Sequence, residues 1–152
     1  MNHDECGKAE LVSAPPFVIL HSSFAPFSMQ PDPFRLRLAA LLGFLAISLG
    51  ASGAHGPVHE KLKAAGELEH WGTAVQYHLP HAVMLLVLTL FASSRPAMIW
   101  AWRMIFTGIL LFSGSLYVLA YTGIKWLGAV TPLGGLSLMI GWVLIAVSAK
   151  VK

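Results

Sequence analysis

Apolar residues in this chain gather into four long blocks that are separated by short polar stretches. The blocks cover about 36–54, 73–92, 100–121 and 126–149. An α-helix needs roughly 20 mostly apolar residues to cross a bilayer, and each block has about that length. The pattern therefore predicts an all-α fold, a four-helix transmembrane bundle whose helices run up, down, up and down.

The second block is the least obvious of the four, because its purely apolar part covers only about 14 residues. To cross the membrane, this helix must begin near Thr73, which draws Gln76, His78 and His81 into the outer part of the bilayer. Pro80 lies between the two histidines and lacks a backbone N–H. The proline therefore frees the carbonyl of Gln76 and favours a kink.

The start of the chain differs from the rest. Residues 1–33 carry five prolines and show no sustained period, so we expect an irregular tail before a membrane domain of residues 34–152. Met29 stands just before the basic pair Arg35 and Arg37 and offers a second candidate start. A cleavable signal peptide is an alternative for the first block, because arginines precede it and small residues end it.

Charge supports the membrane assignment and predicts an orientation. Hydrophobic residues make up 56% of the chain and charged residues 11%, too few charges to cover a soluble domain. Seven Lys and Arg residues lie on the side that holds both termini and three on the other, so we expect both termini in the cytoplasm. The basic residues form no patch for nucleic acid, and the expected partner is the lipid bilayer.

Polar side chains inside the blocks gather toward the outer ends of the predicted helices. Ser52 and His55 share a face of the first helix, His78 and His81 a face of the second, and Tyr117 lies toward the outer end of the third. The main interpretation is that these groups hydrogen-bond the helices together. The alternative is a pocket open to the outside. Its candidate ligand-binding residues are His55, His78, His81, Gln76, Ser52 and Tyr117.

A metal or haem site is the most concrete form of the pocket hypothesis. His78 and His81 can present two ring nitrogens on one face, and His55 can supply a third ligand from the neighbouring helix. No thiolate or carboxylate lies in the predicted spans to complete a typical metal site, so the metal is left open and no cofactor is expected. The chain also lacks a phosphate loop, a zinc-protease motif and a nucleophile elbow, and we do not expect an enzyme.

Small residues at helical spacing let helices approach closely in lipid. Such rows are Ala46, Gly50 and Ala54 on the first helix and Gly134, Ser137 and Gly141 on the fourth. The leading hypothesis is a non-enzymatic membrane protein that acts by association through these faces. The expected partner is a second copy in a homo-oligomer or another membrane protein.

Four segments together resemble one family. They are Gly53-Ala54-His55-Gly56, WGTAVQYHLPH at 71–81, FSGSLYVL at 112–119 and WLGAVTPLGG at 126–135. They are similar to the YgdD-like family of small bacterial inner-membrane proteins, which is related to eukaryotic transmembrane protein 256 and grouped as a domain of unknown function. The resemblance covers about Leu36 to the C-terminus. It implies a retained first helix and a multi-pass protein of the bacterial plasma membrane, and it supplies no catalytic residues. Pro80 departs from the family pattern.

Overall fold

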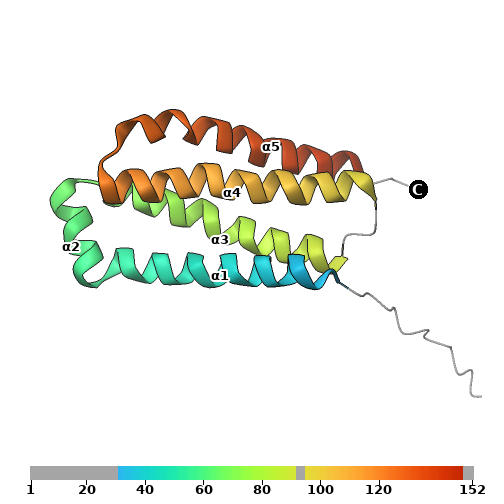
Figure 1. The fold of residues 1–152 in the computed structure, drawn as a ribbon, viewed down its shortest axis with the longest axis horizontal. Coiled ribbons are helices and arrows are strands. Elements are labelled where there is room, and N and C mark those ends of the chain that lie inside the picture. The colour runs from blue at the N-terminus through green and yellow to red at the C-terminus, as the bar shows by residue number, and fades with distance from the viewer. Residues whose placement is uncertain (1–30, 92–94, 149–152) are drawn as a thin grey trace, which may run out of the picture.

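The computed structural model describes residues 31–91 and 95–148, and over these residues it is helical with no strand (Figure 1). Its elements are α1 (Pro33–Ala54), α2 (Gly56–Ala65), α3 (Leu68–Phe91), α4 (Pro96–Thr122), the 3-10 helix η1 (Lys125–Ala129) and α5 (Thr131–Ser148). Within the described residues, four stretches are long and apolar enough to cross a membrane, namely α1, α3, α4, and η1 with α5. The predicted all-α, four-span fold is confirmed. Most of the predicted N-terminal tail lies outside the described residues.

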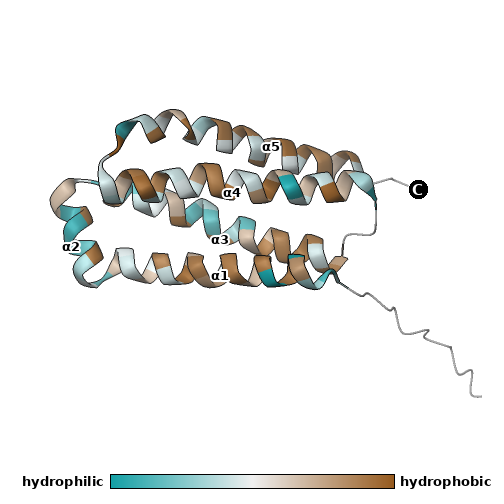
Figure 2. Ribbon diagram, viewed as in Figure 1, coloured by the Kyte–Doolittle hydropathy of each residue, from teal (hydrophilic) through white to brown (hydrophobic). Residues whose placement is uncertain are grey.

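The four long helices run antiparallel to their neighbours in the chain, and α2 lies across one end of them (Figure 1). α1 packs against α3, α3 against α4, and α4 against α5. The long helices are mostly hydrophobic along their length, whereas α2 carries many hydrophilic residues (Figure 2). We therefore expect α2 to lie at a membrane surface, with the other helices in lipid.

Local sequence explains where the helices begin and end. The Asp32 carboxylate accepts hydrogen bonds from the backbone N–H of Phe34 and Arg35, at 2.9 and 3.4 Å, and Pro33 occupies the first turn of α1. Gly66 ends α2 in the left-handed region, with φ of 71°.

All four spans differ from their predicted bounds: α1 begins at Pro33 rather than 36, and α4 at Pro96 rather than 100. α3 begins at Leu68 rather than near Thr73, so Glu69 lies in its first turn, and α3 continues as a helix through Pro80. The fourth span was predicted as one helix from Trp126, but it divides into η1 and α5. Pro132 lies in the first turn of α5, where the missing N–H is tolerated, and this favours a fresh helix start there.

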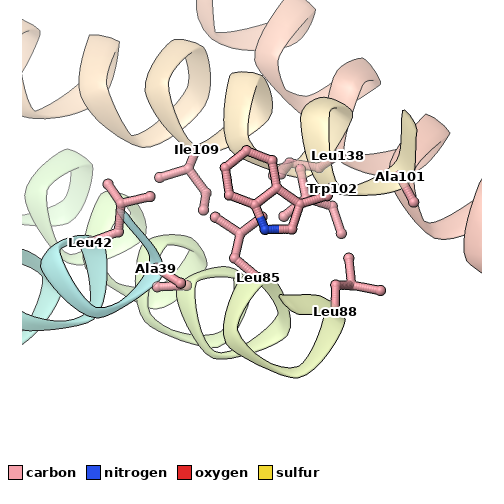
Figure 3. Close-up of a cluster of buried hydrophobic side chains, with 10 residues drawn as sticks. Ala39, Leu42, Leu85, Leu88, Ala101, Trp102, Ile109 and Leu138 are labelled. Carbon is pink, nitrogen blue, oxygen red and sulfur yellow. The ribbon is translucent and has the colours of Figure 1, made fainter. Parts of the chain in front are cut away.

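The core in the half of the bundle away from α2 draws on all four long helices (Figure 3). Trp102 of α4 lies among apolar side chains from its neighbours. The labelled residues around it are Ala39 and Leu42 from α1, Leu85 and Leu88 from α3, Ala101 and Ile109 from α4, and Leu138 from α5. The Trp102 indole N–H donates to Thr89 Oγ1 at 3.0 Å, so the ring's polar atom is satisfied.

The orientation of this bundle is a testable prediction. α3 places Glu67 and Arg95 near opposite ends of the membrane-spanning part, and the Lys and Arg count puts the Arg95 end in the cytoplasm. In a Cys6→Ser background, we expect Glu67→Cys to react with an impermeant maleimide in intact cells. Arg95→Cys should react only after the membrane is permeabilised. Equal access of both cysteines from outside would contradict the topology.

Candidate functional site

The three candidate histidines point in different directions. His55 is exposed at the junction of α1 and α2, His78 is buried, and His81 is half-buried. Within residues 31–91 and 95–148, no group of three His, Cys, Asp or Glu side chains could hold a metal ion. The described residues therefore do not bring His55, His78 and His81 together as ligands of one ion.

His78 packs against Tyr117 of α4 in the half of the bundle near α2. The His78 Nδ1 atom lies 3.4 Å from the Tyr117 hydroxyl, and Tyr117 meets Trp71 edge-on with ring centroids 4.9 Å apart. His78 Nε2 and Ser113 Oγ are buried and have no hydrogen-bond partner in the described part of the chain. Buried polar atoms normally have a partner, so binding of a small solute at His78 and Tyr117 stays a prediction.

His81 instead links α3 to α5. Its Nδ1 lies 2.7 Å from the Tyr77 carbonyl, which can only accept, and its Nε2 receives the Trp142 indole N–H at 3.2 Å. The two bonds fix His81 as the neutral tautomer with the proton on Nδ1. Pairing both nitrogens removes most of the cost of placing an imidazole at this depth. We interpret His81 as a structural bridge.

α1 and α3 meet at Trp71. The Trp71 indole N–H donates to the Leu49 carbonyl at 2.9 Å, and the Ser52 hydroxyl donates to the same carbonyl at 2.9 Å. A Cβ at Gly53 would lie 2.3 Å from Trp71 Nε1, so residue 53 must be glycine for the indole to reach α1. Ser52 is thus used within its own helix and does not point a free hydroxyl into a pocket.

α2 packs over part of the polar region for which the alternative hypothesis was a pocket open to the outside. Leu62 is 0% exposed and lies with Trp71 and Tyr117 in one apolar cluster. Lys61 Nζ lies 3.5 Å from the Tyr121 ring centroid, which holds α2 over the end of α4. His59 is half-buried and donates its Nδ1–H to the Gly53 carbonyl at 2.8 Å. His78, on the next turn but one of α3 from Trp71, is only 4% exposed.

The small-residue row of α5 is used inside the chain. A Cβ at Gly134 would lie 2.3 Å from the Phe112 backbone nitrogen, and Ser137 Oγ donates to the Met104 carbonyl at 2.7 Å. On α1, Ala46 is 0% exposed. The expectation that these faces serve association is corrected for the α5 row, because α4 already covers it.

A crevice on the α1–α3 side stays open. It has a volume of about 350 Å³. Its lining residues are Gly50, Gly53, Ala54, Leu68, Trp71, Gly72, Val75 and Gln76. Gln76 is exposed, and within the described chain its side-chain amide makes no hydrogen bond. The sequence singled out Gln76 but gave no signal for Gly72, whose importance depends on which face of α3 is left uncovered.

Comparisons with known proteins agree with this architecture. A family model described as "Protein of unknown function (DUF423)" matches residues 49–135, which include the whole crevice. The UPF0382 membrane protein YwdK of Bacillus subtilis is 44% identical over 118 residues, covering 74% of this chain and 92% of the relative. The UPF0382 inner membrane protein YgdD of Escherichia coli K12 is 38% identical over 118 residues, covering 76% and 88%. No solved structure matches the chain.

Proposed function

This chain belongs to the DUF423 family of membrane proteins, and from that premise we propose that it is a non-enzymatic protein that acts by pairing with a second copy of itself. It is a multi-pass plasma-membrane protein, as its four spans and its similarity to inner membrane proteins indicate. One observation carries the pairing proposal. The Gln76 amide is exposed on the surface that faces lipid and has no partner within the described residues.

The depth of Gln76 in the bilayer makes its unpaired amide energetically unfavourable when the protein is a monomer. Gln76 lies eight residues after Leu68, or roughly 12 Å along α3 at 1.5 Å per residue. The 24 residues of α3 extend roughly 36 Å, somewhat more than a hydrocarbon core of about 30 Å. The Gln76 amide therefore lies inside the hydrocarbon core, below the boundary with the headgroups. An unsatisfied polar group there costs several kcal/mol.

A second copy supplies the group that the amide lacks. A carboxamide carries both donors and an acceptor, so two Gln76 side chains can satisfy each other across a two-fold axis. A helix of the second copy can approach α3 closely at Gly72, because a Cβ at this position would meet nothing within 4 Å. Gly50, which has no side chain, and Ala54, which has a small one, line the same crevice.

The hydrogen bonds of Ser115 and Thr131 support a non-enzymatic role. Ser115 Oγ lies 2.9 Å from Thr131 Oγ1 and donates to the Phe112 carbonyl at 3.0 Å. Thr131 in turn bonds the Leu127 carbonyl at 3.3 Å. None of these hydroxyls has a histidine or carboxylate beside it among its bonds, which a nucleophile would need.

Crosslinking tests the pairing. In a Cys6→Ser background, Gly72→Cys should form an oxidised dimer in native membranes, whereas Leu133→Cys on the exposed face of α5 should not. Adding Gln76→Leu should weaken the dimer about tenfold, since an interhelical amide bond contributes about 1–2 kcal/mol. Gln76→Asn, which keeps an amide, should retain part of the dimer. Recovery of monomers alone from native membranes would overturn the proposal.

A further inference from the structure

A second hollow lies between α3 and α5, over α4. This α3–α5 groove has a volume of about 380 Å³. Its principal lining residues are Tyr77 and His81 of α3, Phe112 of α4, and Gly135, Met139 and Trp142 of α5. Among the described residues, α3 and α5 make no close backbone approach, so the groove exists because α4 packs against both and holds them apart.

The chemistry of the groove favours hydrocarbon. Its lining holds no charged side chain, and three of its residues are aromatic, one from each helix. His81 adds no free polar atom, because both of its nitrogens are hydrogen-bonded. Met139 and Trp142 are 60% and 47% exposed, so the groove is continuous with the surface that the membrane covers.

The groove is short enough to lie within one leaflet, because Gly135 and Trp142 are only roughly 11 Å apart along α5. Gly135 and Trp142 lie four and eleven residues after Thr131, or roughly 6 and 17 Å along α5. One half of the hydrocarbon core is about 15 Å thick. The hydrogen bond from Trp142 to His81 crosses from α5 to α3 at the deeper end of this stretch. The groove therefore runs within the leaflet on the α2 side and is bridged near the middle of the bilayer.

The volume of the α3–α5 groove favours a lipid chain over a protein helix as its occupant. A helix about 10 Å across would occupy roughly 1,200 Å³ over 15 Å of its length. The groove offers about 380 Å³, so a helix of a second copy could lie over its mouth but could not fill it. A single extended hydrocarbon chain is slim enough to enter, and small-ligand sites begin near this volume.

We propose that the α3–α5 groove holds one acyl chain of a phospholipid from the leaflet on the α2 side. The chain fills the space between α3 and α5 and packs against Tyr77, Phe112 and Trp142. This lipid stays with the protein when the bulk bilayer is exchanged for detergent. The site is separate from the α1–α3 crevice and does not depend on the pairing proposed above.

Native mass spectrometry of the full chain in mild detergent tests this proposal. The wild type should carry one phospholipid. Gly135→Leu should lose it, because the new side chain enters the groove, where a Cβ at Gly135 has only the Phe112 ring at 3.6 Å. Leu136→Phe is the matched control, since Leu136 is exposed beside the groove and does not line it. This control should keep the lipid.

Circular dichroism and gel filtration check that each variant folds. If Gly135→Leu does not fold, Met139→Trp fills the groove from its rim and should also remove the lipid. A wild type without retained lipid would overturn the proposal. So would a lipid that survives both groove-filling changes, or a bound mass that corresponds to a prenyl lipid instead of a phospholipid.

Discussion

Replacing Gly134 with alanine is expected to destabilise the fold by about 3 kcal/mol, at the upper end of the usual cost of overpacking. A Cβ at this position would lie 2.3 Å from the Phe112 nitrogen and 2.7 Å from the Leu111 carbonyl carbon. Both atoms belong to the α4 backbone and cannot rotate away. α4 and α5 would have to separate, which would also loosen the contacts around Ser137. Reversible unfolding in mixed SDS micelles measures the free energy.

Gly135→Ala is the matched control for this change. The two glycines are neighbours on α5, and both substitutions raise intrinsic helix propensity by up to about 1 kcal/mol. A Cβ at Gly135 would meet only the Phe112 ring at 3.6 Å, an ordinary contact. We expect Gly135→Ala to be neutral or slightly stabilising. Equal effects of the two variants would mean that α4 and α5 are not packed as described.

The spans could be predicted from the sequence because crossing a bilayer requires long apolar blocks, whatever their neighbours are. The row of Gly134, Ser137 and Gly141 was also visible. The helix that packs on this row could not be predicted. A row of small residues shows that another helix can approach closely, but it does not identify that helix. In the structure α4 covers this row, and the proposed association therefore uses the α1–α3 crevice.

The candidate site was harder to predict. His78 and His81 lie three residues apart, which separates them by about 60° around a helix. In a bundle this angle is enough to direct His78 toward α4 and His81 toward α5. The cover formed by α2 was not visible either. This cover depends on Leu62, which is the single buried residue of α2. One apolar position in a polar stretch produces no repeating hydrophobic pattern from which the burial of α2 could be predicted.

The segments that carried the family resemblance meet one another in space. Gly53 lies against Trp71, Trp71 against Tyr117, and Phe112 against Gly134. These contacts join α1 to α3, α3 to α4 and α4 to α5. The four segments therefore supply contacts between each pair of successive long helices.

Trp71→Ala is expected to cost about 3–5 kcal/mol, the usual range for removing a buried tryptophan. Trp71 is buried, donates its indole N–H to the Leu49 carbonyl and packs edge-on against Tyr117. Its loss leaves a cavity where α1, α3 and α4 meet beneath Leu62. Trp126→Ala is the matched control, because Trp126 is 69% exposed, and it should cost far less. Similar costs for the two tryptophans would contradict the burial of Trp71.

A double-mutant cycle isolates the contact between Trp71 and Gly53. Gly53→Ala alone should destabilise the wild type by about 1–3 kcal/mol, because its Cβ would lie 2.3 Å from Trp71 Nε1. In the Trp71→Ala background the obstructing ring is gone, so the same change should be nearly neutral. The expected coupling free energy is therefore about 1–3 kcal/mol. Gly72→Ala, where a Cβ meets open space, should show no coupling. Additive effects of Gly53→Ala and Trp71→Ala would show that the indole does not lie against α1.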